Sequence, residues 1–186
     1  MKYLSFILLF AIIGIVSCKN FHNKDANSKI DSTINRDSLL NDIQEIEFQV
    51  FNEMAIDTLK ANTLIGKYVY FANTFSTDSL AAEYLLRASE IAANIGQVHN
   101  SLNYLKRIER DCPDYKRYAF VLYYLGYLND NVLKSKEQAR FYYNRFINEY
   151  PNHKLVGDAK ALLNMLEIND LDLIRQFEAA NEIDSL

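Results

Sequence analysis

Residues 101–128 read SLNYLKRIERDCPDYKRYAFVLYYLGYL, and residues 139–166 read ARFYYNRFINEYPNHKLVGDAKALLNML. The two segments align without a gap when Ser101 is placed on Ala139. The identical positions are Tyr104/Tyr142, Arg107/Arg145, Pro113/Pro151, Lys116/Lys154, Leu125/Leu163 and Leu128/Leu166. The matching positions include the proline that ends a helix and residues typical of a protein core. The alignment therefore indicates an internal repeat.

Small residues recur where the two helices of such a repeat would touch. One unit reads Leu122-x2-Leu125-Gly126-x2-Asn129, then Ala139-x3-Tyr143, then Pro151. The unit before it reads Tyr84-x2-Arg87-Ala88-x2-Ile91, then Ser101-x3-Leu105, then Pro113. Gly126 and Ala88 would let the first helix approach the second, on which Ala139 and Ser101 are the small partners. A proline then ends the second helix because it cannot donate a backbone hydrogen bond.

This pattern resembles the tetratricopeptide repeat, W-x2-L-G-x2-Y…A-x3-F…P, over roughly residues 57–180. The chain departs from it in having no tryptophan. Its period, measured from Pro113 to Pro151, is also longer than the roughly 34 residues of that repeat. The longer period resembles the repeats of the Tol-Pal coordinators and of the helical lipoproteins of the outer-membrane barrel-assembly machinery. The resemblance implies stacked helix pairs that bind other proteins and catalyse no reaction.

Apolar residues recur at helical spacing along the rest of the chain. The expected helices are 39–54, 59–73, 79–94, 99–112, 116–130, 135–150, 155–166 and 171–180. Gly96 is expected to stop the third helix, Ser135 to open the sixth with Gln138 in a capping box, and Asp170 to cap the last. The expected fold class is therefore all-α, with about three antiparallel helix pairs and a C-terminal cap helix.

The N-terminal residues have the pattern of an export signal. Lys2 precedes an apolar run over residues 4–16, which is short for a membrane span of roughly 20 residues. The sequence IVSC at residues 15–18 resembles the bacterial lipobox, which implies cleavage before Cys18 and acylation of that residue by diacylglycerol and a fatty acid such as palmitate. The alternatives are an uncleaved anchor and an ordinary secretion signal followed by an incidental cysteine.

This interpretation divides the chain into three regions. Residues 1–17 are a signal peptide, residues 18–36 the lipidated cysteine and a flexible polar tether, and residues 37–183 the helical repeat domain. With Cys18 acylated, Cys112 is the only other cysteine, so no internal disulfide is expected. By resemblance to known lipoprotein sorting, a lysine after the acylated cysteine favours the outer membrane.

Composition and spacing argue against several kinds of site. The formal charge is −4, and no basic cluster is present, so nucleic acid is not an expected partner. His22, His99 and His153 have no metal-ligand spacing to one another or to a cysteine. The five glycines are isolated and form no phosphate-binding loop. We therefore expect no metal, no cofactor and no enzymatic activity.

A group of carboxylates in the first expected helix has two interpretations. Asp42, Glu45 and Glu47 lie close together in the sequence, as an acid–base pair would allow. They also fall on the outward part of an amphipathic helix. We interpret them as a solvated face rather than a catalytic pair.

The candidate partner-binding residues lie on the first helix of each repeat. Phe120, Tyr123 and Tyr127, spaced i, i+3 and i+7, fall on the side that usually lines the concave groove, with Leu85 and Ser89 as counterparts one repeat earlier. Tyrosine offers a large apolar area with a hydrogen-bonding tip, as residues at protein interfaces often do. The alternative is that this stripe packs against the neighbouring repeat.

Together these features predict an envelope scaffold. It would be anchored by lipid in the outer membrane, face the periplasm and bind an envelope protein in its groove. A receptor for a small solute or glycan is a second hypothesis, and an enzyme is a third. Inward aromatic side chains with convergent polar groups would favour the receptor.

Overall fold

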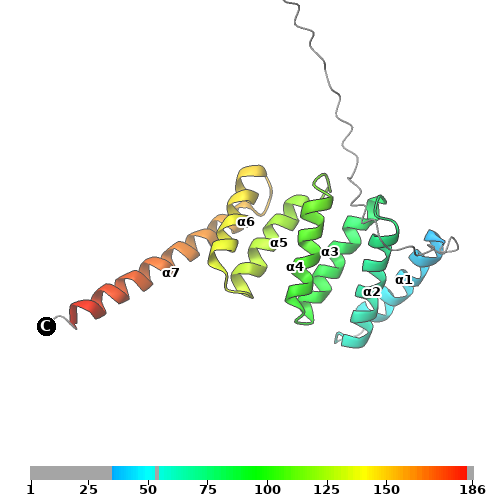
Figure 1. The fold of residues 1–186 in the computed structure, drawn as a ribbon, viewed down its shortest axis with the longest axis horizontal. Coiled ribbons are helices and arrows are strands. Elements are labelled where there is room, and N and C mark those ends of the chain that lie inside the picture. Colours follow the sequence, from blue (N-terminus) through cyan, green and yellow to red (C-terminus); the bar gives the residue numbers. More distant parts are fainter. Residues whose placement is uncertain (1–34, 53–54, 184–186) are drawn as a thin grey trace, which may run out of the picture.

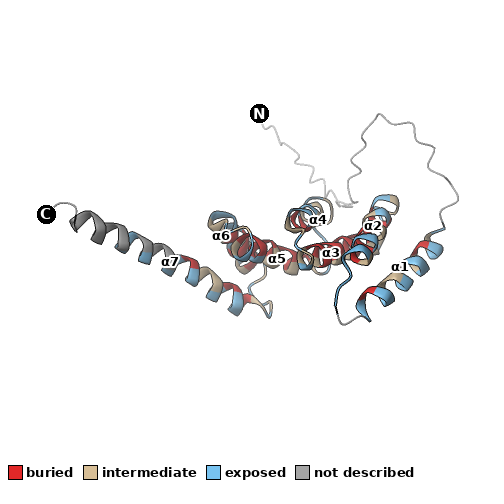
Figure 2. Ribbon diagram, turned by 90° about the horizontal axis from the view of Figure 1, so that it is seen from below, coloured by how far each residue is buried: buried red, intermediate tan, exposed pale blue. Residues whose placement is uncertain are grey.

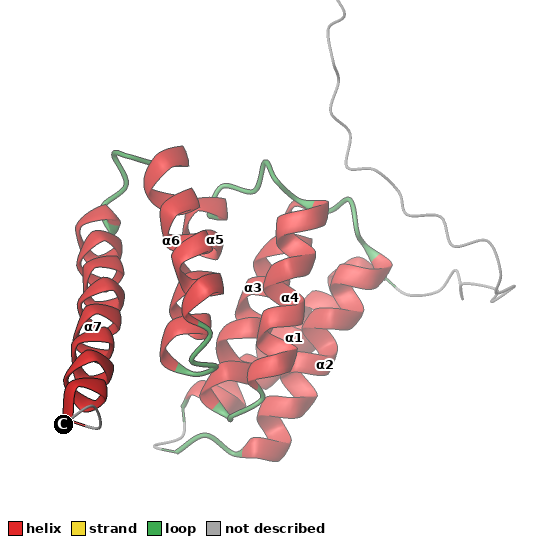
Figure 3. Cartoon of the chain, turned by 60° about the vertical axis from the view of Figure 1, so that its left-hand side comes forward, coloured by secondary structure: helices red, strands yellow, loops and turns green. Residues whose placement is uncertain are grey.

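The computed structural model describes residues 35–52 and 55–183, and within them every regular element is a helix (Figures 1 and 3). The helices are α1 (Arg36–Phe51), α2 (Thr58–Thr74), α3 (Ser79–Asn94), α4 (Val98–Asp111), α5 (Tyr118–Asn131), α6 (Lys136–Glu149) and α7 (Val156–Ile183). The expectation of an all-α chain is confirmed.

The helices form three antiparallel pairs and a final single helix. The main contacts join helices that follow one another in the chain, so the pairs α1/α2, α3/α4 and α5/α6 stack in one row and α7 follows α6. Figure 2 shows α1, α3, α5 and α7 on one side of the row and α2, α4 and α6 on the other. The architecture is the expected solenoid.

The sequence period is also the structural period. Helices α4 and α6 have equal lengths and begin at Val98 and Lys136, and α5 and α7 begin at Tyr118 and Val156. The first residues of α4 and α6, and those of α5 and α7, are separated by the same number of residues as Pro113 and Pro151. The turn containing each proline therefore has the same length in both repeats.

The register of the earlier repeat differs by one residue from the expected one. Ser89, rather than Ala88, contacts the second helix, because its Oγ lies 2.8 Å from the Oγ of Ser101 and both side chains are fully buried. The segment from Gly126 to Ala139 is one residue longer than that from Ser89 to Ser101. The extra residue falls in the α5–α6 connection, which is one residue longer than the connection between α3 and α4.

Local signals at the helix ends were partly predictive. Gly96 has the left-handed φ of 79° that ends a helix, and the N–H of Gln97 donates to the carbonyl of Ala92 at 2.7 Å. The predicted capping box at Ser135 is wrong: its side chain makes no cap hydrogen bond. The N–H of Ser135 donates to the carbonyl of Asn129 at 2.8 Å, so it is not free for the side chain of Gln138, as a capping box requires.

The C-terminal helices expected at 155–166 and 171–180 are one continuous helix, α7. Asp170 lies inside it rather than at a cap. The chain from residue 158 to 183 contains neither glycine nor proline, so the polar residues between the two expected helices do not break the backbone hydrogen-bond ladder.

Two groups of buried side chains form the core. One lies between α1, α2 and α3 and includes Tyr68 and Phe71. The other runs from the end of α2 to α7 and includes Tyr142, Tyr143 and Phe146. Each group fills the space between successive pairs, as nearest-neighbour packing in a solenoid requires.

Gly126 lies where α5 and α6 touch, as predicted. A Cβ added there would lie 2.6 Å from Cδ1 of Tyr143, and that ring is fully buried. We expect Gly126→Leu to lower the free energy of unfolding by about 1–3 kcal/mol or more through overpacking.

Gly66 provides the matched control for this prediction. It is an exposed glycine inside α2, and a Cβ there would meet nothing within 4 Å. We expect Gly66→Ala to raise the stability by up to about 1 kcal/mol. The measurement is the urea midpoint of each variant. A midpoint that also rises for Gly126→Ala and Gly126→Leu would contradict the close contact.

Candidate partner-binding groove

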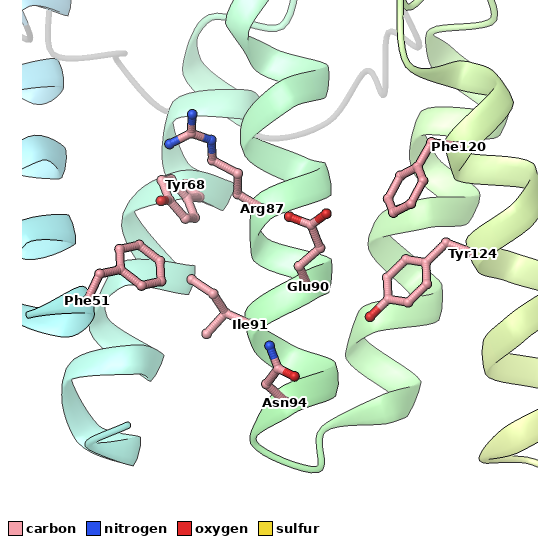
Figure 4. A pocket seen from close by; sticks show the side chains of 8 residues that line it. All are labelled: Phe51, Tyr68, Arg87, Glu90, Ile91, Asn94, Phe120 and Tyr124. Carbon is pink, nitrogen blue, oxygen red and sulfur yellow. The ribbon is translucent and has the colours of Figure 1, made fainter. Parts of the chain in front are cut away.

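A groove of about 540 Å³ opens on the side of the stack formed by α1, α3 and α5. Its lining residues are Phe51 from α1, Tyr68 from α2, Arg87, Glu90, Ile91 and Asn94 from α3, and Phe120 and Tyr124 from α5 (Figure 4). The groove is therefore lined by the first helix of each of the three pairs together with α2.

The α3 wall of the groove is a charged stripe. This helix packs against both α2 and α4, so one strip of its surface stays open. The residues on that strip, spaced i, i+4, i+7 and i+11, are Glu83, Arg87, Glu90 and Asn94. Because about 3.6 residues complete a helical turn, these side chains lie above one another on one face. The open strip presents charge and amide groups to the groove.

The α5 wall is an aromatic stripe at the corresponding positions. Phe120, Tyr124 and Tyr127 follow Glu83, Arg87 and Glu90 at one constant offset along the chain. The rings of Phe120 and Tyr124 stack with centroids 5.7 Å apart, and those of Tyr124 and Tyr127 with centroids 6.2 Å apart. Burial raises the pKa of Tyr124 to about 12, so its hydroxyl keeps its proton at neutral pH.

Ion pairs link the helices that line the groove. Arg87 contacts Glu47 of α1 at 2.7 Å and Glu83 at 3.4 Å. Arg117, which precedes α5, contacts Glu83 at 3.2 Å and Glu90 at 3.5 Å. The network holds α1, α3 and α5 in a fixed relative position around the groove.

Two tyrosine hydroxyls complete this network. Tyr68 donates to Glu47 at 2.5 Å, and Tyr115 donates to Glu83 at 2.6 Å. Burial acts to raise the pKa of Glu83, but the Tyr115 hydrogen bond and the two guanidinium groups outweigh it and lower that pKa. Burial also raises the pKa of Glu90, only partly offset by Arg117.

The interpretation of Asp42, Glu45 and Glu47 as one solvated face is wrong for Glu47. That side chain is half-buried and accepts hydrogen bonds from Tyr68 and Arg87. Asp42 and Glu45 are exposed, and Asp42 pairs with Lys67 at 2.9 Å. The packing of α1 against the neighbouring pair is what brings Glu47 to these partners.

Two of the predicted binding residues are in the core. Leu85 is 2% exposed and Ser89 is fully buried against Ser101. They are the structural counterparts of Leu122 and Gly126, not of Tyr123 and Tyr127, because of the one-residue difference in register. Neither can contact a partner without unfolding of the repeat.

The aromatic residues predicted on α5 divide between two environments. Tyr123 packs on α6, the other helix of its own pair, with ring centroids 6.1 Å from Tyr143 and 5.6 Å from Phe146, which is neither the groove nor the neighbouring repeat of the packing alternative. Phe120 lines the groove, and Tyr127, which is 41% exposed, continues the stack beyond Tyr124. Tyr124 was missed, although the spacing i, i+4, i+7 from Phe120 would have identified it.

Other kinds of site have little support in residues 35–52 and 55–183. This part of the chain holds no group of three or more His, Cys, Asp or Glu side chains arranged to bind a metal ion. No helix there is both long and apolar enough to cross a membrane.

Comparison with known proteins assigns the repeat. Residues 120–153, which run from α5 to the turn after α6, match the model of the tetratricopeptide repeat family. Neither a curated protein nor a solved structure matches the chain. Residues 35–52 and 55–183 thus form an all-α solenoid of the tetratricopeptide type, in which residues 120–153 match the repeat itself. Such repeats generally mediate contacts between proteins and usually act as non-catalytic scaffolds.

Proposed function

We propose that this chain is a lipid-anchored envelope scaffold that binds a protein partner in the groove between α1, α3 and α5. The observation that carries the proposal is the stack of Phe120, Tyr124 and Tyr127 at the groove wall. Aromatic side chains that are held rigid and yet accessible are the usual anchors of protein interfaces. The partner is an envelope protein, possessing a segment that fits a groove of about 540 Å³.

The anchor and the location rest on residues outside those that the structure describes. Cys18 and the lipobox resemblance favour a lipid at the start of the mature chain, and the polar residues 19–35 separate it from α1. We place the protein at the outer membrane, facing the periplasm, where the groove is open to other envelope proteins.

A receptor for a small solute or glycan is the second candidate. The groove has a volume typical of ligand pockets, which is about 300–1,000 Å³. It also combines stacked aromatic rings with the polar groups of Arg87, Glu90 and Asn94. A bound solute would raise the melting temperature of the purified protein without any second protein being present.

The test of the proposed function is capture of a partner from detergent-solubilised envelopes, identified by mass spectrometry. Phe51 lines the groove and is 59% exposed, and Tyr127 stacks on the groove residue Tyr124 and is 41% exposed, so their replacement by Ala leaves the core intact. We expect the Phe51→Ala/Tyr127→Ala variant to lose capture of one protein while melting like the wild type. A single anchoring aromatic contributes about 2 kcal/mol or more, or roughly thirtyfold in affinity.

The matched control is Phe141→Ala on α6. Phe141 is 51% exposed but lies outside the groove, so this variant should capture the partner as the wild type does. Equal capture by the groove variant and the control would contradict the proposal. Absence of any captured protein, together with a thermal shift on adding glycans, would favour the receptor.

A further inference from the structure

Glu90 occupies the centre of the groove. It projects from α3 into the space that Arg87 borders on one side and that Phe120 and Tyr124 border on the other (Figure 4). Its side chain is 36% exposed, so it is reachable from solvent and yet surrounded largely by protein. A ligand at the centre of the groove would contact this carboxylate.

Glu90 is the least paired carboxylate of the groove network. Glu47 and Glu83 each accept a tyrosine hydroxyl and contact a guanidinium at 2.7 Å and 3.2 Å respectively. Among the residues described, Glu90 has one ion pair, at 3.5 Å with Arg117. Arg117 contacts Glu83 more closely and also lies 5.1 Å from the centroid of the Phe120 ring.

The charges in the groove therefore do not cancel. Three carboxylates share two guanidinium groups, and the excess negative charge lies at Glu90. Burial raises the pKa of this carboxyl group, which means that the groove stabilises its charge less well than water does. A cation that enters the groove would offset this cost, whereas an anion would meet carboxylates whose guanidinium partners are already engaged.

The aromatic wall next to Glu90 favours the same kind of ligand. Arg117 already lies over the ring of Phe120, so Phe120 and Tyr124 act through their apolar surface, along which the methylene groups of a long side chain can lie. Ile91 and Phe51 add apolar surface at the other side of the groove. The formal charge of −4 on the whole chain also favours association with a basic partner.

We propose that the groove recognises a lysine or arginine side chain in an apolar segment of the protein partner, with its cation at Glu90 and its methylene groups against Phe120 and Tyr124. The inference rests on the proposed function and specifies the chemistry of the partner. An apolar neighbour of the basic residue then contacts Phe51 and Ile91. Glu90 determines specificity, while the aromatic stack supplies most of the contact area.

The experiment selects peptides on the full-length chain purified in mild detergent. A phage library of random dodecapeptides is panned on the wild type, and clones that also bind the Phe51→Ala/Tyr127→Ala variant are removed. We expect the remaining groove-dependent clones to be enriched in Lys or Arg next to an apolar residue. The same selection on Glu90→Gln should lose the basic preference. On Glu45→Gln, which changes the net charge equally but on an exposed position of α1, the preference should persist.

A second measurement compares two peptides on the wild type, so its main result does not require the Glu90→Gln variant. The best peptide and a copy with norleucine in place of its lysine are titrated by calorimetry. We expect the norleucine peptide to bind the wild type about tenfold more weakly, and both peptides to bind Glu90→Gln equally. Equal affinities on the wild type would overturn the inference, even if Glu90→Gln proved unstable.

The outcomes separate the two proposals. Groove-dependent peptides without a preference for Lys or Arg would overturn the role of Glu90 and leave the proposed function standing. Failure to obtain any groove-dependent peptide would contradict both. A loss of the preference on Glu45→Gln in place of Glu90→Gln would assign it to the overall charge of the chain and would likewise overturn the inference.

Discussion

Replacing Phe146 by Ala is expected to lower the free energy of unfolding by about 3–5 kcal/mol. The ring of Phe146 is fully buried where α5, α6 and the turn after Pro151 meet. Its centroid lies 5.6 Å from that of Tyr123 and 5.2 Å from that of His153. Its loss would therefore leave a cavity between α5 and α6 as well as remove aromatic contacts. Because small domains have about 5–15 kcal/mol of total stability, the variant should be close to unfolding at physiological temperature.

Phe141 on the same helix is the matched control. It is 51% exposed, and an arginine guanidinium lies 5.7 Å from its ring centroid. Phe141→Ala should change stability by less than about 1 kcal/mol. Urea unfolding followed by helical circular dichroism measures both variants. Similar midpoints for the two would show that α6 does not bury Phe146 as described. Any broadening of the transition would indicate that the repeats no longer unfold together.

The parts of this fold that the sequence predicted are those that depend on spacing within one repeat. The offset between Pro113 and Pro151 identified the repeat, and the starts of α4 and α6 are separated by the same offset. Gly126 was predicted at the α5–α6 contact, where it lies against Tyr143. Steric requirements of this kind leave few allowed residues at a position, so they are visible in a single sequence.

The errors arose where one element had to be aligned with another across a connection. A single additional residue between α5 and α6 changed the counterparts of Tyr123 and Tyr127, so Leu85 and Ser89 were placed at the groove although both are buried. A slip of one residue rotates a helix by about 100°, which is enough to exchange an open face for a buried one. The apolar periodicity of two helices does not show how many residues the connection between them contains, so it does not fix the register of one helix against the other.

The charged half of the groove could not be predicted from local pattern at all. Arg87 pairs with Glu47, 40 residues earlier in the chain, and Arg117 pairs with Glu83, 34 residues earlier. On a helix alone each of these residues is typical of a solvated face. Only the packing of α1 and α5 on either side of α3 brings the opposite charges together and leaves Glu90 with the weakest partner.

Replacing Cys18 by Ser is expected to release the protein from the membrane or to leave it as an unprocessed precursor. Cys18 lies outside the described residues, and the role that we propose for it rests on the resemblance of residues 15–18 to the lipobox. In that motif the sulfur atom of the cysteine receives the diacylglyceryl group, and a serine hydroxyl does not replace it. Two or more acyl chains give stable anchoring, whereas a polar tether alone gives none. The expected effect is therefore loss of the membrane-bound mature form rather than a modest shift.

Incorporation of radioactive palmitate and fractionation of the envelope measure this effect. The wild type should carry the label and sediment with the outer membrane, and Cys18→Ser should carry none. Cys112→Ser is the matched control, because Cys112 is the only other cysteine and lies at the end of α4, packed against the core. It should be labelled and sorted as the wild type is. A Cys18→Ser protein that is processed and sediments with the membrane would contradict the lipid anchor, while the groove and its partner would remain open to the binding tests.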